Sequence, residues 1–351
     1  MKYTKVYLEA IGYELAPVVV TSDELEERLE SLYTKLHVPA GSLEALTGIA
    51  ERRWWEPHHS LSRNAAAAAK KALAKSGVPA VALETVVYAG VCRESFEPAT
   101  ACAVAAQLGV EGAASVYDIS NACLGILNGI HEIANRIELG QMRAGIVVSA
   151  ETAREIVDVT IERMLREATM TAYTGGLATL TGGSGAVAVL LTDGSFGNEG
   201  SHRVLGGAQR AAPKHHKLCR WGLADAPTLH RSEPLLQSMY TDAAAVLEHG
   251  VTLGVETWRD FLGQMGWESD DVDRVICHQV GAPHRDAILG SIGIAADKDF
   301  STFPYLGNIG TVSLPITAAL AEEREAVRPG DRVAFLGIGS GLNCLMLGVE
   351  W

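Results

Sequence analysis

The chain has 351 residues and a formal net charge of −13, which argues against nucleic acid as a partner. The sequence contains no run of about eighteen apolar residues, so it predicts no membrane span. The opening segment MKYTKVYLEAIGYEL lacks the apolar core of a signal peptide. We therefore expect a cytoplasmic protein. Hydrophobic residues make up 48% of the chain and 36 residues are glycine, which favours an α/β protein with buried strands.

The first half of the chain is expected to alternate strands with helices. Capping residues at Thr21–Glu24 begin the first helix, and Gly77 ends the second. Residues 46–55 are expected to form a basic, aromatic turn. The expected helices cover residues 21–36, 61–75, 99–108 and 123–139, and the expected strands cover residues 5–11, 86–90, 116–119 and 145–149.

Tyr117–Gly129, with the sequence YDISNACLGILNG, carries the strongest chemical pattern. An apolar strand breaks at Ser120–Ala122 and is expected to lead into a helix that begins near Cys123. Unpaired backbone N–H groups and the helix dipole at such a position favour the thiolate, the nucleophilic form of cysteine. A small, buried hydrophobic residue is the alternative interpretation of Cys123.

The second half of the chain repeats the plan of the first. Glu84–Tyr88 resembles Asp273–Cys277, which begins 189 residues later, and other landmarks keep nearly the same offset. The repeat predicts two similar α/β halves, residues 1–192 and 193–351, related by a pseudo-twofold axis. Equivalent loops of two such halves would converge on one site.

The second half offers two partners for Cys123. His278 lies at the carboxyl end of the buried strand VICHQV, where α/β proteins place ligands, and Asn308 lies in the turn LGNIG. A cysteine nucleophile needs an imidazole, and a thioester carbonyl needs donors for the charge that develops on its oxygen. Taken alone, His278 could be structural and Asn308 a helix cap. Together they favour a catalytic group.

A glycine loop, Gly337–Gly341, follows an expected strand but leaves too few residues for a dinucleotide-binding βαβ unit. We expect it to direct the N–H group of Gly341 into the site, beside that of Cys123. Histidine pairs at 58–59 and 215–216 lack the companion carboxylates of a metal site, and the six cysteines follow no disulfide spacing. The sequence thus predicts neither a metal nor another cofactor.

These motifs together resemble the condensing enzymes of the thiolase superfamily, of the ketoacyl synthase III type. DISNACLGILNG is similar to the nucleophile turn, VICHQV to the histidine strand, YLGNIGTVSLP to the asparagine turn and FLGIGSGLN to the closing glycine loop. The resemblance covers essentially the whole chain. It implies a thiolase-like fold layered α-β-α-β-α, an acyl intermediate on Cys123 and a homodimer.

Within this family the chain is most similar to the members that join two fatty acyl-CoA molecules head to head. That reaction is a non-decarboxylative Claisen condensation to a 2-alkyl-3-oxo acid for long-chain olefin synthesis. This closer resemblance depends on Glu97 in RESFEPATA, where other members have an apolar aromatic residue. A saturated acyl thioester needs a base to remove its α proton. The resemblance implies that Glu97 is that base, that the partner subunit supplies it, and that downstream olefin-pathway enzymes are partners.

Two alternative functions remain open. The chain could be a decarboxylating 3-oxoacyl-ACP synthase III-type enzyme, or an acyltransferase that uses a malonyl or other acyl thioester, and Glu97 argues against this. It could also be a catalytically silent subunit of a larger assembly. The intact Cys123, His278 and Asn308 argue against the silent subunit.

The expected contacts to coenzyme A depart from the family pattern. Leu46 stands where the family usually has arginine before TGI, and Leu306 stands where it usually has histidine before Gly-Asn. We therefore expect other residues to hold the nucleotide of the acyl-CoA substrate. The candidates are Arg52, Trp54, Trp55, Lys214 and Arg220.

Overall fold

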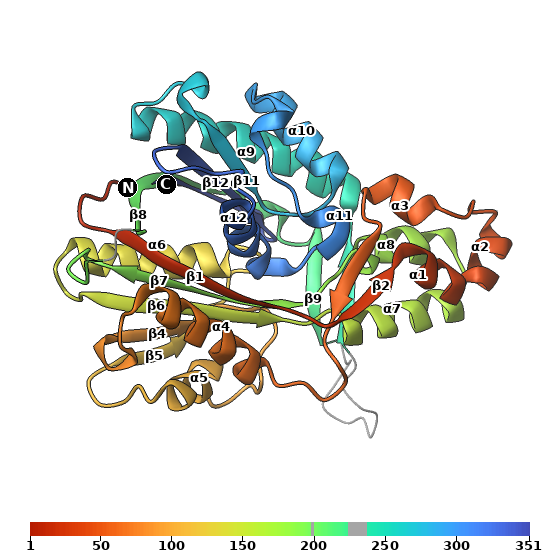
Figure 1. The fold of residues 1–351 in the computed structure, drawn as a ribbon. Coiled ribbons are helices and arrows are strands. Elements are labelled where there is room, and N and C mark those ends of the chain that lie inside the picture. The colour runs from red at the N-terminus through yellow and green to blue at the C-terminus, as the bar shows by residue number, and fades with distance from the viewer. Residues whose placement is uncertain (198–199, 224–236) are drawn as a thin grey trace.

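A computed structural model describes residues 1–197, 200–223 and 237–351 (Figure 1). The helices are α1 Ser22–Arg28, α2 Glu30–Leu36, α3 Ser42–Thr47, α4 Leu61–Ser76, α5 Thr100–Leu108, α6 Gly125–Glu138, α7 Arg154–Glu167, α8 Met170–Leu180, α9 Ala243–Met265, α10 Ala282–Ile292, α11 Phe303–Leu306 and α12 Ser313–Glu323. The strands are β1 Tyr7–Leu15, β2 Val18–Thr21, β3 Glu51–Trp54, β4 Thr85–Tyr88, β5 Ser115–Asp118, β6 Ala144–Glu151, β7 Gly185–Thr192, β8 His202–Ala211, β9 Cys219–Leu223, β10 Gln237–Thr241, β11 Arg274–Cys277, β12 Arg332–Gly339 and β13 Asn343–Glu350.

The described strands form a large sheet in the order β11-β12-β13-β8-β1-β7-β6-β4-β5. In the first half, β1 runs antiparallel to β7 and β7 to β6, while β6 and β5 flank β4 in parallel. In the second half, β8 runs antiparallel to β13 and β13 to β12, while β11 is parallel to β12. A parallel bridge between Val275 and Asp299 stands where the second half would place a counterpart of β5.

The two parts of the sheet are joined through a short pairing of β1 with β8, at Tyr7 with Arg203 and Leu8 with His202. Because one sheet runs through both parts, the sheet itself marks no boundary between them. The division of the chain between residues 192 and 193 therefore stays a prediction. The strand directions nevertheless follow the same pattern in both parts. Counting outward from β1 in one part and from β8 in the other, the first two pairings are antiparallel and the next is parallel. The two parts are therefore similar in topology, as the repeat predicts.

Three apolar cores fix the order of the layers. One core packs α4 and α5 against β4, β6 and β7, and another packs α9 and α10 against β11, β12 and β13. Between the two parts of the sheet, α6 and α12 share a third core with residues of both parts. Figure 1 shows α9 and α10 on one side, α4 and α5 on the other and α12 between, which agrees with the expected α-β-α-β-α layering. A smaller core joins α1, α2, α3, α7 and α8 at one end of the molecule.

Most expected elements appear within a few residues of their expected bounds. The capping pattern is present, because the Thr21 side chain accepts from the Glu24 N–H group and the Glu24 side chain accepts from the Thr21 N–H group. The expectation of a turn at residues 46–55 was wrong. Residues up to Thr47 belong to α3, and β3 pairs with β2 because two short β-prone segments meet over the α1–α3 core.

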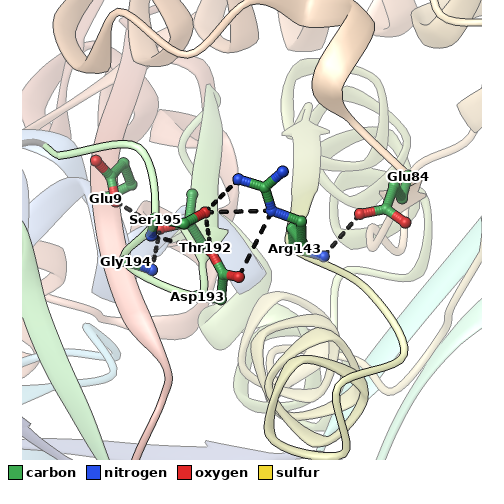
Figure 2. Close-up of polar contacts among 7 residues, drawn as sticks. All are labelled: Glu9, Glu84, Arg143, Thr192, Asp193, Gly194 and Ser195. Atoms are coloured by element: carbon green, nitrogen blue, oxygen red, sulfur yellow. Dashed lines mark hydrogen bonds and ion pairs between the residues drawn. The ribbon is translucent and has the colours of Figure 1, made fainter.

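Polar contacts close the turn after β7, where the chain leaves the first half (Figure 2). Thr192 donates to Glu9 on β1 at 2.6 Å, and the Arg143 guanidinium donates to Ser195 at 2.6 Å. The Arg143 N–H group also donates to Glu84, the residue before β4, at 2.7 Å. These contacts tie the ends of β1, β4, β6 and β7 together, at the opposite ends of β4 and β6 from the loops that carry the candidate site.

Gly12 lets β1 lie directly against α4. A Cβ atom built on Gly12 would overlap the Ala68 carbonyl oxygen and the Ala72 backbone nitrogen, and neither backbone atom can move without shifting the helix. We predict that Gly12→Ala lowers the free energy of unfolding by about 3 kcal/mol, the cost of overpacking a tight core. Thermal or urea unfolding would measure it. Gly290→Ala in α10, with no neighbour within 4 Å, is the matched control, and equal effects of the two variants would contradict the prediction.

Candidate active site

Cys123 lies in a tight turn between β5 and α6. Ala122 adopts a left-handed backbone conformation with φ of 46°, and α6 begins only at Gly125. Cys123 therefore precedes the helix by two residues, rather than starting it as expected. A Cβ atom at Gly125 would overlap the Ala89 carbonyl oxygen, so only glycine allows the helix to begin this close to β4.

The start of α6 is held by residues of the second half. The Ile126 N–H group donates to the Thr311 hydroxyl at 2.7 Å, which satisfies one of the unpaired donors at the helix start. Before the helix, Asn121 donates to Asn128 at 2.7 Å and accepts from Asn343 at 3.1 Å. Asn343 follows the glycine loop, so Asn121 links the cysteine turn to that loop.

His278 directly follows β11, as the strand pattern predicts. Its Nδ1 atom lies 2.7 Å from the Ser313 hydroxyl, at the start of α12, and the two residues are buried. This contact occupies one ring nitrogen and leaves Nε2 as the nitrogen that can exchange a proton with a ligand. No pattern in the sequence singled out Ser313, because only the fold brings α12 beside β11.

Asn308 is held in a fixed orientation between the two halves. Its backbone N–H group donates to Thr181 at 2.9 Å, and its carbonyl accepts from Gly183 at 3.0 Å. Its side-chain oxygen accepts from the Gly310 N–H group at 3.1 Å. This contact uses the side-chain oxygen and leaves the NH2 group as the donor for a ligand.

One cavity of about 770 Å³ unites the central candidates. Cys123, His278, Asn308 and Gly341 all line it, although they come from loops up to 218 residues apart in the chain. Most of the remaining wall is apolar. The structure thus brings together the group of residues that the sequence predicts.

The resting charge of Cys123 differs from the expectation. Burial raises the pKa of the Cys123 thiol to about 12, with smaller contributions from Cys219 and Glu151. Burial also lowers the pKa of the His278 imidazole to about 4, and the nearby His284 adds to this shift. The expected thiolate was wrong because desolvation outweighs the helix dipole, and the thiol and the imidazole are both neutral at pH 7.

Glu151 and His284 also line this cavity, and the sequence interpretation missed both. Glu151 is the last residue of β6, and burial raises the pKa of its carboxyl group. Its position at the carboxyl end of a strand, like that of His278, is the signal that could have found it. His284 lies in the first turn of α10, and its Nε2 atom has no hydrogen-bond partner.

Glu97 lies outside the cavity of its own chain. It is exposed in the loop between β4 and α5, next to Phe96, whose relative exposure of 90% is unusual for an aromatic residue. The rest of this loop is anchored by three carboxylates, each of which accepts hydrogen bonds from backbone N–H groups. The hydrogen bonds run from Val91 and Cys92 to Glu151 (2.9 and 3.0 Å), from Ser62 to Glu94 (2.8 Å) and from Thr100 and Ala101 to Asp118 (both 2.9 Å).

Three of the candidates for nucleotide binding have structural positions instead. Arg52 is fully buried and donates to the Ser22 hydroxyl at 3.0 Å. The Trp54 and Trp55 indoles are also buried, and they donate to the carbonyls of Gly182 and Glu151, each at 3.0 Å. Assigning Arg52, Trp54 and Trp55 to coenzyme A was wrong, since these side chains fasten β3 to the body of the fold.

The basic segment from Lys214 to Arg220 is better placed to meet an anionic ligand than Arg52, Trp54 and Trp55 are. Arg220 is exposed and lines the cavity, whereas Lys214 is exposed without lining it. His216, which lies between these two residues, and Arg285, which the sequence did not single out, line the cavity too. Three basic side chains therefore stand at the cavity of a strongly acidic protein.

Within the described residues, no group of three or more His, Cys, Asp or Glu side chains could hold a metal ion. The helices in the same part of the chain include none that is long and apolar enough to cross a membrane.

Comparisons with known proteins place this site in a family. Residues 117–211 match 3-oxoacyl-[acyl-carrier-protein] synthase III, and residues 262–351 match the C-terminal region of the same family. The acyl-CoA:acyl-CoA alkyltransferase of Shewanella oneidensis is 55% identical, with 100% of both chains covered. The chain belongs to the ketoacyl synthase III family of condensing enzymes. The acyl-CoA:acyl-CoA alkyltransferase of Xanthomonas campestris is 34% identical, again over 100% of both chains.

Solved structures agree with this family. Cerulenin-bound OleA from Xanthomonas campestris has a TM-score of 0.93 at 34% identity, covering 100% of this chain and 98% of that chain. OleA with bound lauric acid and lauroyl-CoA has a TM-score of 0.91 at 33% identity, covering 99% of this chain and 100% of that one. The expected thiolase-like fold and the resemblance to the enzymes that condense two acyl-CoA molecules are confirmed.

The neutral state of His278 predicts an unusual pH dependence. Because its pKa is lowered to about 4, the imidazole stays neutral and able to accept a proton as the pH falls from 7 to 5. We expect the rate of acyl transfer to Cys123 to stay nearly constant over this range, as measured by rapid quenching and mass spectrometry of intact protein. Half of the rate lost near pH 6.5, the ordinary value for histidine, would contradict the prediction, provided that circular dichroism shows the fold intact.

Proposed function

We propose that this protein joins two fatty acyl-CoA molecules in a non-decarboxylative Claisen condensation to a 2-alkyl-3-oxo acid. The observation that carries the proposal is that Cys123, His278 and Asn308 line one largely apolar cavity, combined with a carboxylate, Glu97, on an exposed and well-anchored loop. The relatives named acyl-CoA:acyl-CoA alkyltransferase support the same reaction. The reaction needs no metal or other cofactor.

In the first step, the Cys123 sulfur attacks the thioester carbonyl of one acyl-CoA. The thiol proton passes to Nε2 of His278, because the raised pKa of the thiol means that the sulfur needs an acceptor for its proton. The Asn308 NH2 group and the N–H groups of Cys123 and Gly341 are proposed donors to the carbonyl oxygen as it gains charge. Coenzyme A leaves as a thiol after taking the proton back, and the acyl group remains on Cys123.

In the second step, Glu97 removes the α proton of a second acyl-CoA. The resulting carbanion attacks the carbonyl of acyl-Cys123, and the sulfur–carbon bond breaks. The sulfur leaves as a thiolate and takes up the proton that Glu97 removed, so that both groups return to their resting states. The product is a 2-alkyl-3-oxoacyl-CoA, which water hydrolyses to the acid and coenzyme A. Glu97 lies outside the cavity of its own chain, so we propose a homodimer in which the partner subunit supplies it.

The coenzyme A moiety is proposed to lie over the basic side chains at the cavity. Arg220, His216 and Arg285 offer donors to its phosphates, and Lys214 can add a longer-range attraction. Downstream enzymes of olefin synthesis as partners and a cytoplasmic location remain predictions that follow from the family resemblance and from the sequence.

Substitution of Cys123 and of Glu97 separates the two steps. With one long-chain acyl-CoA and no malonyl donor, wild type should form a thioester adduct and the condensed product, and Cys123→Ser should form neither. Glu97→Gln keeps the shape of the side chain but cannot accept a proton. It should form the adduct while losing about 10²–10⁴-fold in condensation.

Intact-protein mass spectrometry and product extraction provide the measurements. An adduct on another cysteine would remove Cys123 from the proposal. A product that requires malonyl-CoA and releases carbon dioxide would favour a decarboxylating synthase instead. No adduct and no product under either condition would favour a silent subunit.

Mixing two inactive variants tests the in-trans assignment of Glu97. A heterodimer of Cys123→Ser and Glu97→Gln subunits contains one site with both Cys123 and Glu97, so subunit exchange should restore up to a quarter of wild-type activity, about one site in four, when exchange is random. Sedimentation should give the mass of a dimer, and native mass spectrometry with one labelled variant should report the exchange. An active monomer, or an exchanged mixture without activity, would count against the assignment.

A further inference from the structure

The apolar part of the cavity has a region bounded by α9, α10, β12 and β13, which we call the α9 lobe. It is continuous with the cysteine turn through the glycine loop. Cys123 lines the same cavity as Ile338 and Gly339 of β12 and as Gly250 and Gly254 of α9. An acyl group on Cys123 can therefore reach this lobe without leaving the cavity.

Two glycines of α9 leave room for the lobe. Gly250 and Gly254 are one helical turn apart, so they share a face of α9, and both line the cavity. A Cβ atom at Gly254 would lie 2.7 Å from Cδ1 of Ile288 on α10, and one at Gly250 would lie 3.1 Å from Cδ1 of Ile338 on β12. Both isoleucines line the cavity as well. Any side chain at either glycine must displace an isoleucine or occupy the lobe itself.

The far end of the lobe is also defined. Within α9, all of whose residues the structure describes, the lining begins at Ala243 and stops at Gly254. The next turns of the helix bury Trp258 and Phe261, whose rings stack with centroids 5.3 Å apart. From Ala243 to Gly254 the helix rises about 16 Å, a length that suits an extended alkyl chain rather than an acetyl group.

We propose that Gly250 and Gly254, with Ile288 as the movable end wall, set the maximum length of the acyl chain carried by Cys123. This inference rests on the proposed function, since it requires an acyl-cysteine intermediate. Glycine is needed at these positions because a methyl group would shorten the lobe. Each methylene of the substrate that no longer fits should then cost about fourfold in kcat/KM for acylation, the factor that corresponds to about 0.8 kcal/mol per buried methylene.

The experiment measures kcat/KM for acyl-enzyme formation with saturated acyl-CoA substrates from hexanoyl to stearoyl. Gly250→Ala and Gly254→Ala should keep the hexanoyl rate and lose the longest chains, with the optimum moved to shorter substrates. Ile288→Ala should move the optimum to longer ones. Gly263→Ala is the matched control, because Gly263 lies on the exposed side of the same helix with no neighbour within 4 Å and should leave the profile unchanged.

Opposite shifts for the glycine and isoleucine variants would support the proposal. If the glycine variants lose activity equally at all chain lengths, the chain-length profile of Ile288→Ala decides whether the lobe limits the acyl chain. An unchanged profile in that variant overturns the proposal. Profiles that match wild type in all three variants overturn it as well. A wild-type protein that forms no acyl-enzyme with any substrate would refute the proposed function, an outcome distinct from acylation without any length shift.

Discussion

The buried hydrogen bond from the Ile126 N–H group to the Thr311 hydroxyl joins the starts of the two central helices. The first N–H groups of a helix have no partner within it, and leaving one buried and unsatisfied costs about 1–3 kcal/mol. The bond therefore stabilises α6 and at the same time positions it against the loop before α12. The cysteine turn precedes α6 and the asparagine turn precedes α12, so this short contact between the halves determines how Cys123 and Asn308 face one cavity.

The apolar character of that cavity determines the chemistry of its nucleophile. Charging both Cys123 and His278 without water would require desolvating two ions, so the neutral pair is the more stable resting state. A neutral thiol reacts slowly with other electrophiles. In the proposed mechanism it becomes a nucleophile only when a thioester lies beside it and His278 takes the proton. The apolar walls that hold an alkyl chain in the proposed function thus also keep the resting thiol protonated.

The loop that carries Glu97 is anchored at both ends and exposed at its tip, as the proposed in-trans role of Glu97 requires. Glu151, Glu94 and Asp118 each accept backbone N–H groups from the loop or from the helices beside it, which fixes both ends and leaves the tip outside. Glu151 has a second role in the geometry, because it also lines the cavity of its own chain. Glu151 therefore connects the cavity of this chain to the loop that carries Glu97, the loop that the proposed function assigns to the site of the partner subunit.

The sequence by itself determined the local features of this protein. The apolar runs and glycines predicted most helices and strands. The short motifs around Cys123, His278 and Asn308 identified residues of the cavity, because the break from a strand into a turn is marked by the small and polar residues at that point of the chain. Tertiary structure decided what depends on burial. The aromatic and basic residues Arg52, Trp54 and Trp55 look like ligands in the sequence, but they are enclosed by segments from distant parts of the chain. The charge of Cys123 was also decided there, since the helix start that favours a thiolate is a local property, whereas the desolvation that outweighs it comes from walls contributed by the whole fold.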